Sequence, residues 1–300
     1  MPYGWRAAAL ALCLALPVVP GCAGSSADVT APPSGNNPPP EPPTSPPPSP
    51  PPSPPAPPPS PPPAPPPSPP PGPPIPNPPG IGAGARVLFI GNSLTEGNDL
   101  PGMVRALASA AGLNWDVQAQ LLSGAGLEDH WARGFAQQRI QSGHWDAVVL
   151  QQGPSSLPES RVNLRQWTGE FDGLVRAAGG RSALYMVWPM LDRFSWFDRV
   201  RDSYALAARD VSGYFLPAGE TWRAAWRSTP SLTLYGGDGF HPTVAGTYAA
   251  ALTIFAGLSG RSPLGLPPPA TVDSRTAERL QQATLEALED YGDYGPTDVP

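Results

Sequence analysis

The chain has 300 residues, a net charge of −6 and a pI near 5.0, and 32 of its 48 prolines lie between Ala31 and Gly80. So much proline cannot build a packed core, so the length supports one folded domain rather than two. The basic residues are scattered arginines, which argues against nucleic acid as a partner, because phosphate binding requires a concentrated basic face.

Residues 1–22 have the pattern of a bacterial export signal. The apolar run Ala7–Val19 is too short to cross a bilayer of ~30 Å hydrocarbon as a settled helix. The following V-P-G-C resembles a lipobox, in which Cys22 is lipidated and becomes the mature N-terminus. Pro20 departs from the small residues usual there, and ordinary cleavage near Ala23 is the alternative. We favour a lipoprotein held at a membrane of the cell envelope, because an unpaired exposed thiol is otherwise hard to explain in an exported chain.

Residues 23–80 are predicted to be a disordered, proline-rich linker. From Ala31 to Gly80 the sequence repeats P-P-P-S and P-P-P-A, which fixes φ, removes backbone donors and favours an extended polyproline II rod. At ~3.1 Å per residue, such a tract reaches roughly 150 Å. This repetitive sequence favours a spacer over a docking site for proline-binding domains, because such a docking site would need flanking residues that give specificity.

Residues 81–300 are predicted to form one domain in which strands alternate with helices. Strands are expected at Arg86–Ile90, Trp115–Leu122, Ala147–Gln151, Ser182–Val187 and Tyr214–Leu216, and helices at Leu100–Ala111, Leu127–Gln141, Leu164–Ala178, Phe197–Val211, Thr243–Leu258 and Ser274–Tyr291. Continuous apolar strands indicate a parallel sheet covered on both faces. The expected fold is therefore a three-layer α/β/α sandwich, which binds ligands at the carboxyl ends of its strands.

Two segments far apart in the chain carry the residues of a serine hydrolase. Ser93 follows the first strand in G-N-S-L-T-E-G, a turn that suits a nucleophile because backbone N–H groups lie beside it. Asp238 stands three residues before His241 in D-G-F-H-P, so its carboxylate can orient the imidazole. A serine that only caps a helix and an aspartate in a surface turn are the alternatives, and only the joint occurrence favours catalysis.

Two further loops offer donors for an oxyanion. After the second strand, S-G-A-G contains Gly124 and Gly126, whose N–H groups carry no side chain in the way. After the third strand, residues 151–156 (QQGPSS) place amides and hydroxyls at a carboxyl end. An ordinary loop, with amides that only hold the backbone, is the alternative in both cases.

Together these segments resemble the SGNH, or GDSL-type, hydrolase family over nearly the whole folded domain, most strongly at F-I-G-N-S-L-T and D-G-F-H-P. The resemblance implies a flavodoxin-like sheet, no cofactor or metal requirement, and hydrolysis of esters or acetyl esters. It assigns the nucleophile to Ser93, the late acid and base to Asp238 and His241, and the oxyanion hole to Ser93 and Gly124, with Gly126 as the alternative glycine.

The third block departs from the family pattern. The family has G-x-N-D where this chain has G-P-S-S, so the asparagine that donates to the oxyanion falls on Ser155. Similar chains with G-N-S in the first block carry a glutamine in the third, which implies a glutamine donor. We favour Gln152 over Gln151 and Ser155.

A metal site is not expected in the folded domain. Cys13 and Cys22 both precede the linker, and His130, His144 and His241 lie far apart in the sequence. We expect His130 and His144 to be structural.

The leading interpretation is an exported esterase that removes an acyl group, with acetyl favoured, from an envelope or extracellular carbohydrate. The alternatives are a non-catalytic carbohydrate-binding protein on the same scaffold and a lipase or thioesterase, because acyl specificity resides in loop geometry. Four tryptophans in or near expected loops could stack on sugar rings, although core packing is the commoner fate of this residue: Trp188, Trp196, Trp222 and Trp226.

The lipobox-like segment predicts lipid attachment at Cys22. When the full-length chain is expressed in bacteria with labelled fatty acid, it should incorporate label, and Cys22→Ser should abolish the incorporation. Equal labelling of both forms, or an unlabelled wild type beside a labelled control lipoprotein, would contradict the prediction.

Overall fold

The structure is a computed structural model that describes residues 78–293. The expected export signal, Cys22 and nearly all of the expected linker therefore lie outside the described residues. None of the helices in the described part of the chain is both long and apolar enough to cross a bilayer.

The described residues contain a five-stranded parallel sheet with the strand order β2-β1-β3-β4-β5. Its strands are β1 (Arg86–Gly91), β2 (Asp116–Leu121), β3 (Ala147–Leu150), β4 (Arg181–Tyr185) and β5 (Tyr214–Leu216). Every residue of β3 is buried, as a central strand covered on both faces requires. The order is the flavodoxin-like one, whose switch point lies between β1 and β3. The expected parallel sheet is thus confirmed.

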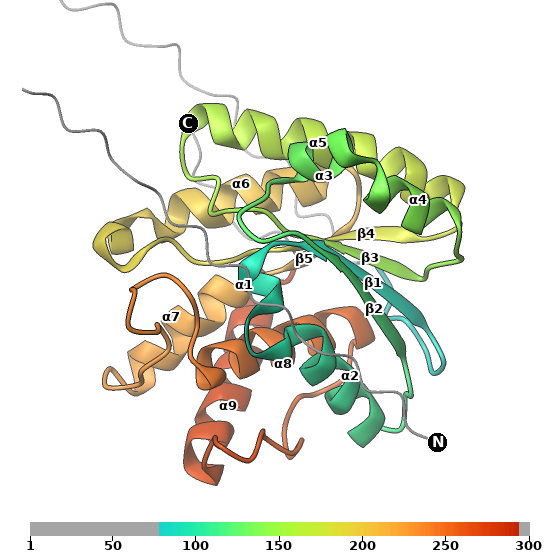
Figure 1. Cartoon of the computed structure of the whole chain (residues 1–300). Helices are drawn as coiled ribbons and strands as arrows, with labels where there is room; N and C mark the ends of the chain where they lie inside the picture. Colours follow the sequence, from blue (N-terminus) through green and yellow to red (C-terminus); the bar gives the residue numbers. More distant parts are fainter. Residues whose placement is uncertain (1–77, 294–300) are drawn as a thin grey trace, which may run out of the picture. The chain divides into compact units, whose positions relative to one another are not determined.

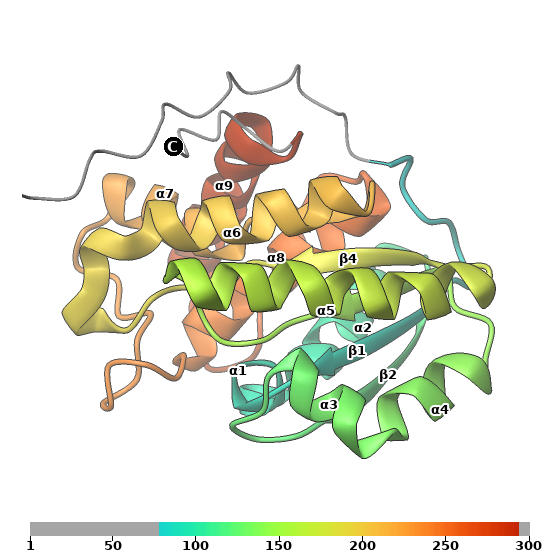
Figure 2. The same ribbon diagram turned by 90° about the horizontal axis from the view of Figure 1, so that it is seen from above.

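Helices cover both faces of the sheet (Figures 1 and 2). One face carries α3 (Leu127–Arg133), α4 (Phe135–Gln141), α5 (Pro158–Ala177) and α6 (Phe197–Asp210). The other carries α2 (Leu100–Ala110) and α8 (Val244–Ser259), with α7 (Ala218–Ser228) and α9 (Ser274–Tyr291) packed beside α8. Because α8 lies between the sheet and these helices, it is buried on nearly all sides, which explains its apolar sequence. The α/β/α layers are therefore those predicted.

Three helical details differ from the expectations. The segment 127–141 forms two helices, because Gly134 adopts a left-handed conformation (φ 78°) that ends α3. Helix α5 begins at Pro158, earlier than expected, with the proline in the first turn where its missing N–H costs nothing. Helix α7 was not predicted, although it is amphipathic; its buried face also includes Glu220 and Thr221.

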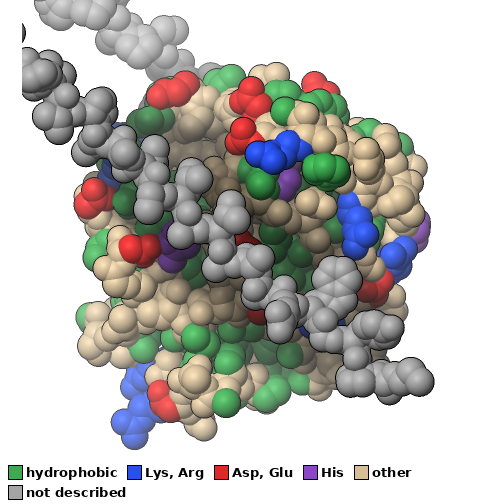
Figure 3. All heavy atoms as spheres, in the orientation of Figure 1, with side chains coloured by type: hydrophobic (Ala, Val, Ile, Leu, Met, Phe, Trp, Pro, Cys, Tyr) green, Lys and Arg blue, Asp and Glu red, His purple; other side chains and the backbone are tan. Residues whose placement is uncertain are grey.

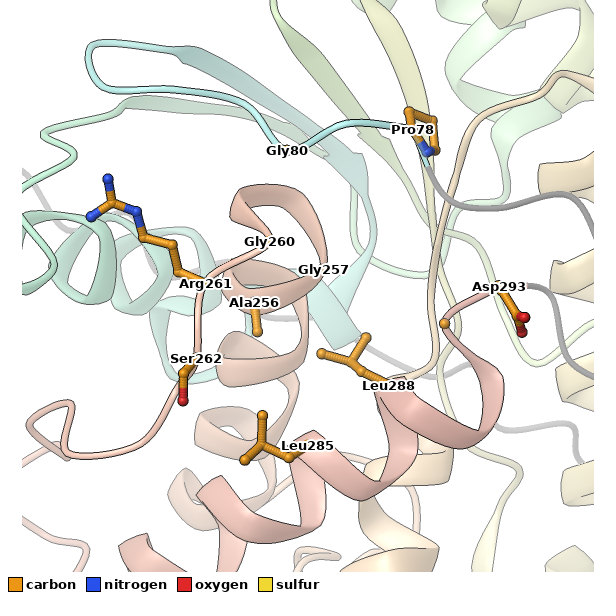
Figure 4. A pocket seen from close by; sticks show the side chains of 11 residues that line it. Pro78, Gly80, Ala256, Gly257, Gly260, Arg261, Ser262, Leu285, Leu288 and Asp293 are labelled. Atoms are coloured by element: carbon orange, nitrogen blue, oxygen red, sulfur yellow. The ribbon is translucent and has the colours of Figure 1, made fainter.

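Within the described residues, contacts with the domain begin just before the expected boundary at Ile81. The Tyr214 hydroxyl donates to the Pro79 carbonyl at 2.6 Å, and the Ile81 N–H donates to the last turn of α8 at 2.8 Å. A cavity of about 460 Å³ lies where this segment passes α8 and α9, with Leu288 of α9 facing it (Figure 4). The described chain thus enters the domain as a packed segment.

This packing predicts that Gly80 cannot be replaced. A Cβ at position 80 would lie 2.3 Å from the Ser259 carbonyl oxygen, so Gly80→Ala should lower the free energy of unfolding by about 1–3 kcal/mol in denaturant titrations. Gly82→Ala is the matched control, because a Cβ there meets nothing within 4 Å, and it should change stability by less than about 0.5 kcal/mol. Equal stability of the two variants would contradict the assigned packing.

Candidate active site

Ser93 lies at the carboxyl end of β1, where the short helix α1 (Ser93–Glu96) begins. Asn92 caps this helix: its Oδ1 accepts from the Leu94 N–H at 3.1 Å, and its Nδ2 donates to the Ala125 carbonyl at 2.9 Å. Gly91 has a steric role, because a Cβ there would lie 2.5 Å from the Thr95 hydroxyl. The G-N-S sequence is therefore required by the tightness of the turn.

Gln151 holds this turn from β3. Its Oε1 accepts from the Asn92 N–H at 2.9 Å and from the Thr95 hydroxyl at 2.7 Å, and its Nε2 donates to Asn92 Oδ1 at 2.9 Å. Gln151 is 1% exposed and Thr95 is fully buried, so these bonds are shielded from competing water. The parallel register of β1 and β3 brings Gln151 beside Asn92, since Ile90 pairs with Leu150.

These contacts leave the Ser93 N–H available. The carbonyl of Asn92 accepts from Thr95 and Glu96, and its side chain accepts from Leu94. Within residues 78–293 the backbone N–H of Ser93 has no hydrogen-bond partner. An unpaired N–H in the first turn of a helix is a ready donor for an anion.

The loop that carries Asp238 and His241 is fixed largely by its own hydrogen bonds. Asp238 Oδ1 accepts from the N–H groups of Phe240 at 3.0 Å and His241 at 2.9 Å, while Oδ2 lies 2.6 Å from His241 Nδ1. Gly239 supplies the left-handed turn (φ 67°) between them. The hydrogen bond from His241, with those from the two backbone N–H groups, lowers the pKa of Asp238 to about 2. The carboxylate is therefore ionised at all ordinary pH values.

Other elements hold the same loop from both sides. Trp188 Nε1 donates to the Phe240 carbonyl at 2.9 Å, the Leu191 N–H donates to Gly239 at 2.9 Å, and Asn98 Nδ2 donates to Pro242 at 3.1 Å. Asn98 belongs to the segment directly after α1, so the Ser93 turn and the histidine loop are fastened together. This contact and the tryptophan bond had no recognisable pattern in the sequence.

Ser93 and His241, 148 positions apart, meet in the structure. His241 Nε2 lies 2.9 Å from Ser93 Oγ. With Asp238 on the opposite ring nitrogen, the three side chains form a continuous chain of hydrogen bonds of the Ser-His-Asp kind. The side chains of His241 and Asp238 are 45% and 52% exposed, so a ligand can reach them from solvent.

The two glycines of the second loop have different environments. Gly126 donates its N–H to Asp129 Oδ2 at 2.8 Å, so this donor is already used. Gly124 has a left-handed backbone (φ 74°), and its N–H has no partner among residues 78–293. The geometry is therefore consistent with Gly124, rather than Gly126, as an available donor.

The two glutamines of the third loop have different hydrogen-bond partners. Both hydrogen-bonding atoms of the Gln151 amide are used on the Ser93 turn and the neighbouring carbonyl. Gln152 accepts from the Leu127 N–H through Oε1 at 3.2 Å and donates one Nε2 hydrogen to Ser155 Oγ at 2.9 Å. Its second Nε2 hydrogen is left for another acceptor. Ser155 is occupied as an acceptor from Gln152 and as a donor to Gly153.

The other histidines have structural contacts. Buried His130 lies with Nε2 3.0 Å from the Gly91 carbonyl, and burial lowers its pKa. His144 Nδ1 lies 3.1 Å from the Ala178 carbonyl. Within the described range, no three His, Cys, Asp or Glu side chains gather in a way that could hold a metal ion.

Two of the four tryptophans differ from the expectation of loop positions. Trp222 and Trp226 lie on α7, and Trp188 and Trp222 are fully buried and stacked with ring centroids 3.6 Å apart. Burial removes these two from any surface that could stack on a sugar ring. Trp196 and Trp226 retain partial exposure.

No protein-family model matches the chain, and no curated protein matches it. Among solved structures, the chain is similar to a DUF4886 family protein from Bacteroides uniformis, at 19% identity over 70% of this chain and 96% of that one, with a TM-score of 0.60. It is also similar to a candidate SGNH hydrolase from Slackia heliotrinireducens, at 27% identity over 57% of this chain and 97% of that one, with a TM-score of 0.49. A third similarity is to a variant of Axe2, an acetylxylan esterase from Geobacillus stearothermophilus, at 19% identity over 62% of this chain and 97% of that one, with a TM-score of 0.47. The first similarity supports the fold.

The contacts of Gln151 predict a structural role for this residue. Gln151→Leu leaves the buried Asn92 N–H and Thr95 hydroxyl unpaired and should lower the free energy of unfolding by about 1–3 kcal/mol in denaturant titrations. Thr95→Val removes only one of these bonds and keeps the shape, so its loss should be smaller. A Gln151→Leu protein as stable as wild type would show that the bridge does not hold the turn.

Proposed function

We propose that the chain is a serine esterase of the SGNH type. The observation that carries the proposal is the hydrogen-bond chain from Ser93 Oγ to His241 Nε2 (2.9 Å) and from His241 Nδ1 to Asp238 (2.6 Å). It lies at the carboxyl end of β1, beside the switch point where sheets of this order bind ligands.

The geometry supports the following reaction. Ser93 Oγ attacks the carbonyl carbon of the ester while His241 Nε2 accepts the hydroxyl proton. Asp238 fixes the tautomer of the ring and stabilises the imidazolium. The imidazolium then gives its proton to the departing alcohol, which leaves an acyl group on Ser93. The same imidazole then deprotonates a water molecule that attacks the acyl carbonyl; the bond to Ser93 Oγ breaks, the carboxylic acid leaves, and the imidazolium returns its proton to Ser93 Oγ.

The tetrahedral intermediate carries a negative oxygen, which requires donors that are not otherwise used. The N–H groups of Ser93 and Gly124 and the second Nε2 hydrogen of Gln152 meet this requirement among the described residues. Gln152 is 5% exposed and held at both ends of its amide, so it is positioned before substrate arrives. It takes the place that the family gives to an asparagine.

The proposed substrate is an ester with a small acyl or sugar group next to the Ser-His-Asp relay, and an O-acetylated carbohydrate is the favoured substrate. A cavity of about 210 Å³ lies between Phe240 of the histidine loop and Ser155 of the third loop, below the ~300 Å³ at which pockets for drug-sized ligands begin. Export and a lipid anchor at Cys22 would place this activity in the cell envelope.

A lipase-like or thioesterase activity is the second candidate, and one feature favours it. An open groove of about 480 Å³ is lined by Leu191, Phe194, Trp226 and Tyr235 and reaches Gly236, two residues before Asp238. Leu191 and Phe194 are 53% and 47% exposed, so this surface could accept a longer apolar acyl chain. Esters of graded acyl length distinguish the two candidates.

The relay predicts that Ser93→Ala and His241→Ala each lower the turnover of p-nitrophenyl acetate by at least ~10⁴-fold, because members of a relay act as a unit. Asp238→Asn keeps the hydroxyl and the imidazole but removes the orienting charge, so its loss should be similar or smaller. Asp238, whose hydrogen bonds lower its pKa to about 2, stays ionised throughout the pH range of these assays.

Covalent labelling by a fluorophosphonate probe provides a second measurement. Wild type should be labelled and a folded Ser93→Ala protein should not. Wild-type turnover by Ser93→Ala would show that another residue is the nucleophile. Absence of both labelling and ester turnover in wild type would replace the esterase with a carbohydrate-binding protein on the same scaffold.

A further inference from the structure

The cavity beside the relay is bordered by an arginine that the esterase mechanism does not use. The 210 Å³ cavity is lined by Ser155, Phe240, Met190 and Arg193, among others. Phe240 connects it with the relay, because its ring centroid lies 5.4 Å from that of His241. Ser155 connects it with the oxyanion donors through its bond from Gln152. A group bound in this cavity would therefore lie next to the reacting ester.

Arg193 is held at this border by a tryptophan. It belongs to η2 (Leu191–Trp196), the 3-10 segment after β4, and its N–H donates to the Met190 carbonyl at 2.8 Å. Its guanidinium carbon lies 4.9 Å from the centroid of the Trp196 ring. This stacking restricts the side chain and leaves the guanidinium N–H donors free to bind an anion.

No carboxylate neutralises Arg193 among residues 78–293. Asp192, the preceding residue, forms no ion pair with it. The acids at the start of α6 are committed elsewhere, since Asp198 pairs with Arg201 and Arg223, and Asp202 pairs with Arg201. Arg193 is thus an unpaired, positioned cation on a chain whose net charge is −6.

We propose that Arg193 determines substrate specificity by binding a carboxylate that lies next to the ester. This inference rests on the proposed esterase function and narrows its substrate class to acidic esters. The carboxylate can belong to the alcohol, as in an O-acetylated uronic acid, or to the acyl group, as in the hemiester of a dicarboxylic acid. In both cases the planar guanidinium can hold the carboxylate through two parallel hydrogen bonds.

A second arginine, Arg199, provides a comparison for Arg193. Arg199 lies against the same indole, with its guanidinium carbon 5.2 Å from the Trp196 centroid. It also has no carboxylate partner in the described part of the chain, but it does not line the cavity. Charges of both signs are interspersed over the face drawn in Figure 3. Of the two arginines on this indole, only Arg193 lines the cavity, so Arg193 is the one placed to contact a bound carboxylate.

The test compares kcat/KM for two matched pairs of esters on the full-length chain. One pair is O-acetylated galacturonic acid and O-acetylated galactose, and the other is mono-p-nitrophenyl succinate and p-nitrophenyl butyrate. Wild type should prefer the acidic member of one pair by about tenfold, as expected for a partly exposed charge-assisted pair. The pair that shows the preference identifies which side of the ester carries the carboxylate. The preference should decrease at high salt.

Arg193→Gln should abolish this preference, and Arg193→Lys should keep part of it, because an ammonium retains the charge without the planar fork. Arg199→Gln is the matched control and should keep the preference within about twofold, since Arg199 stacks on the same indole outside the cavity. A preference that survives Arg193→Gln, or equal kcat/KM for both members of each pair in wild type, would overturn the proposal.

A binding measurement separates this inference from the esterase proposal. In calorimetry the Ser93→Ala protein should bind the acidic member of at least one of the two pairs about tenfold more tightly than its neutral partner, and the double variant with Arg193→Gln should bind both members equally. Absence of ester turnover in wild type would refute the esterase alone, whereas equal affinities of Ser93→Ala within both pairs would refute the role of Arg193.

Discussion

The active-site geometry depends on the bridge between Gln151 and the Ser93 turn. Gln151 extends from the central strand β3, and its amide satisfies the Asn92 N–H, the Asn92 side chain and the Thr95 hydroxyl at once. All of these groups are buried, so an alternative arrangement would leave polar atoms unpaired at a cost of about 1–3 kcal/mol each. The backbone around Ser93 is therefore held rigidly, and among the N–H groups of residues 92–96 only that of Ser93 has no partner in the described part of the chain.

The same bridge relates the sheet to the function. Parallel pairing of Ile90 with Leu150 fixes the register, so the residues after both strands emerge at one edge. Gln151 and Gln152 directly follow the last residue of β3, and their amides bond to different loops, the first to the Ser93 turn and the second to the Leu127 N–H.

The sequence was sufficient to predict the parallel α/β/α fold and to select the residues that meet at the site, because both depend on local patterns. Apolar runs identify buried strands, and the spacing of Asp238 and His241 fits one turn. The different roles of Gln151 and Gln152 could not be predicted, since they depend on the direction in which each side chain points. Helix α7 was missed although it is amphipathic, and the burial of Glu220 near Arg201 of α6 depends on the tertiary structure and could not be read from the sequence.

The exposure of the relay places a further constraint on catalysis. Asp238 is about half exposed, so its Coulombic attraction for an imidazolium is weakened by water and salt. Its orientation rests instead on short-range hydrogen bonds, from the backbone of Phe240 and His241 and from the imidazole ring. The oxyanion donors lose strength in the same way while water reaches them. Bound substrate must therefore supply part of the low-dielectric environment, and groups that fill the cavity between Phe240 and Ser155 would exclude water from the reacting ester as well as position it.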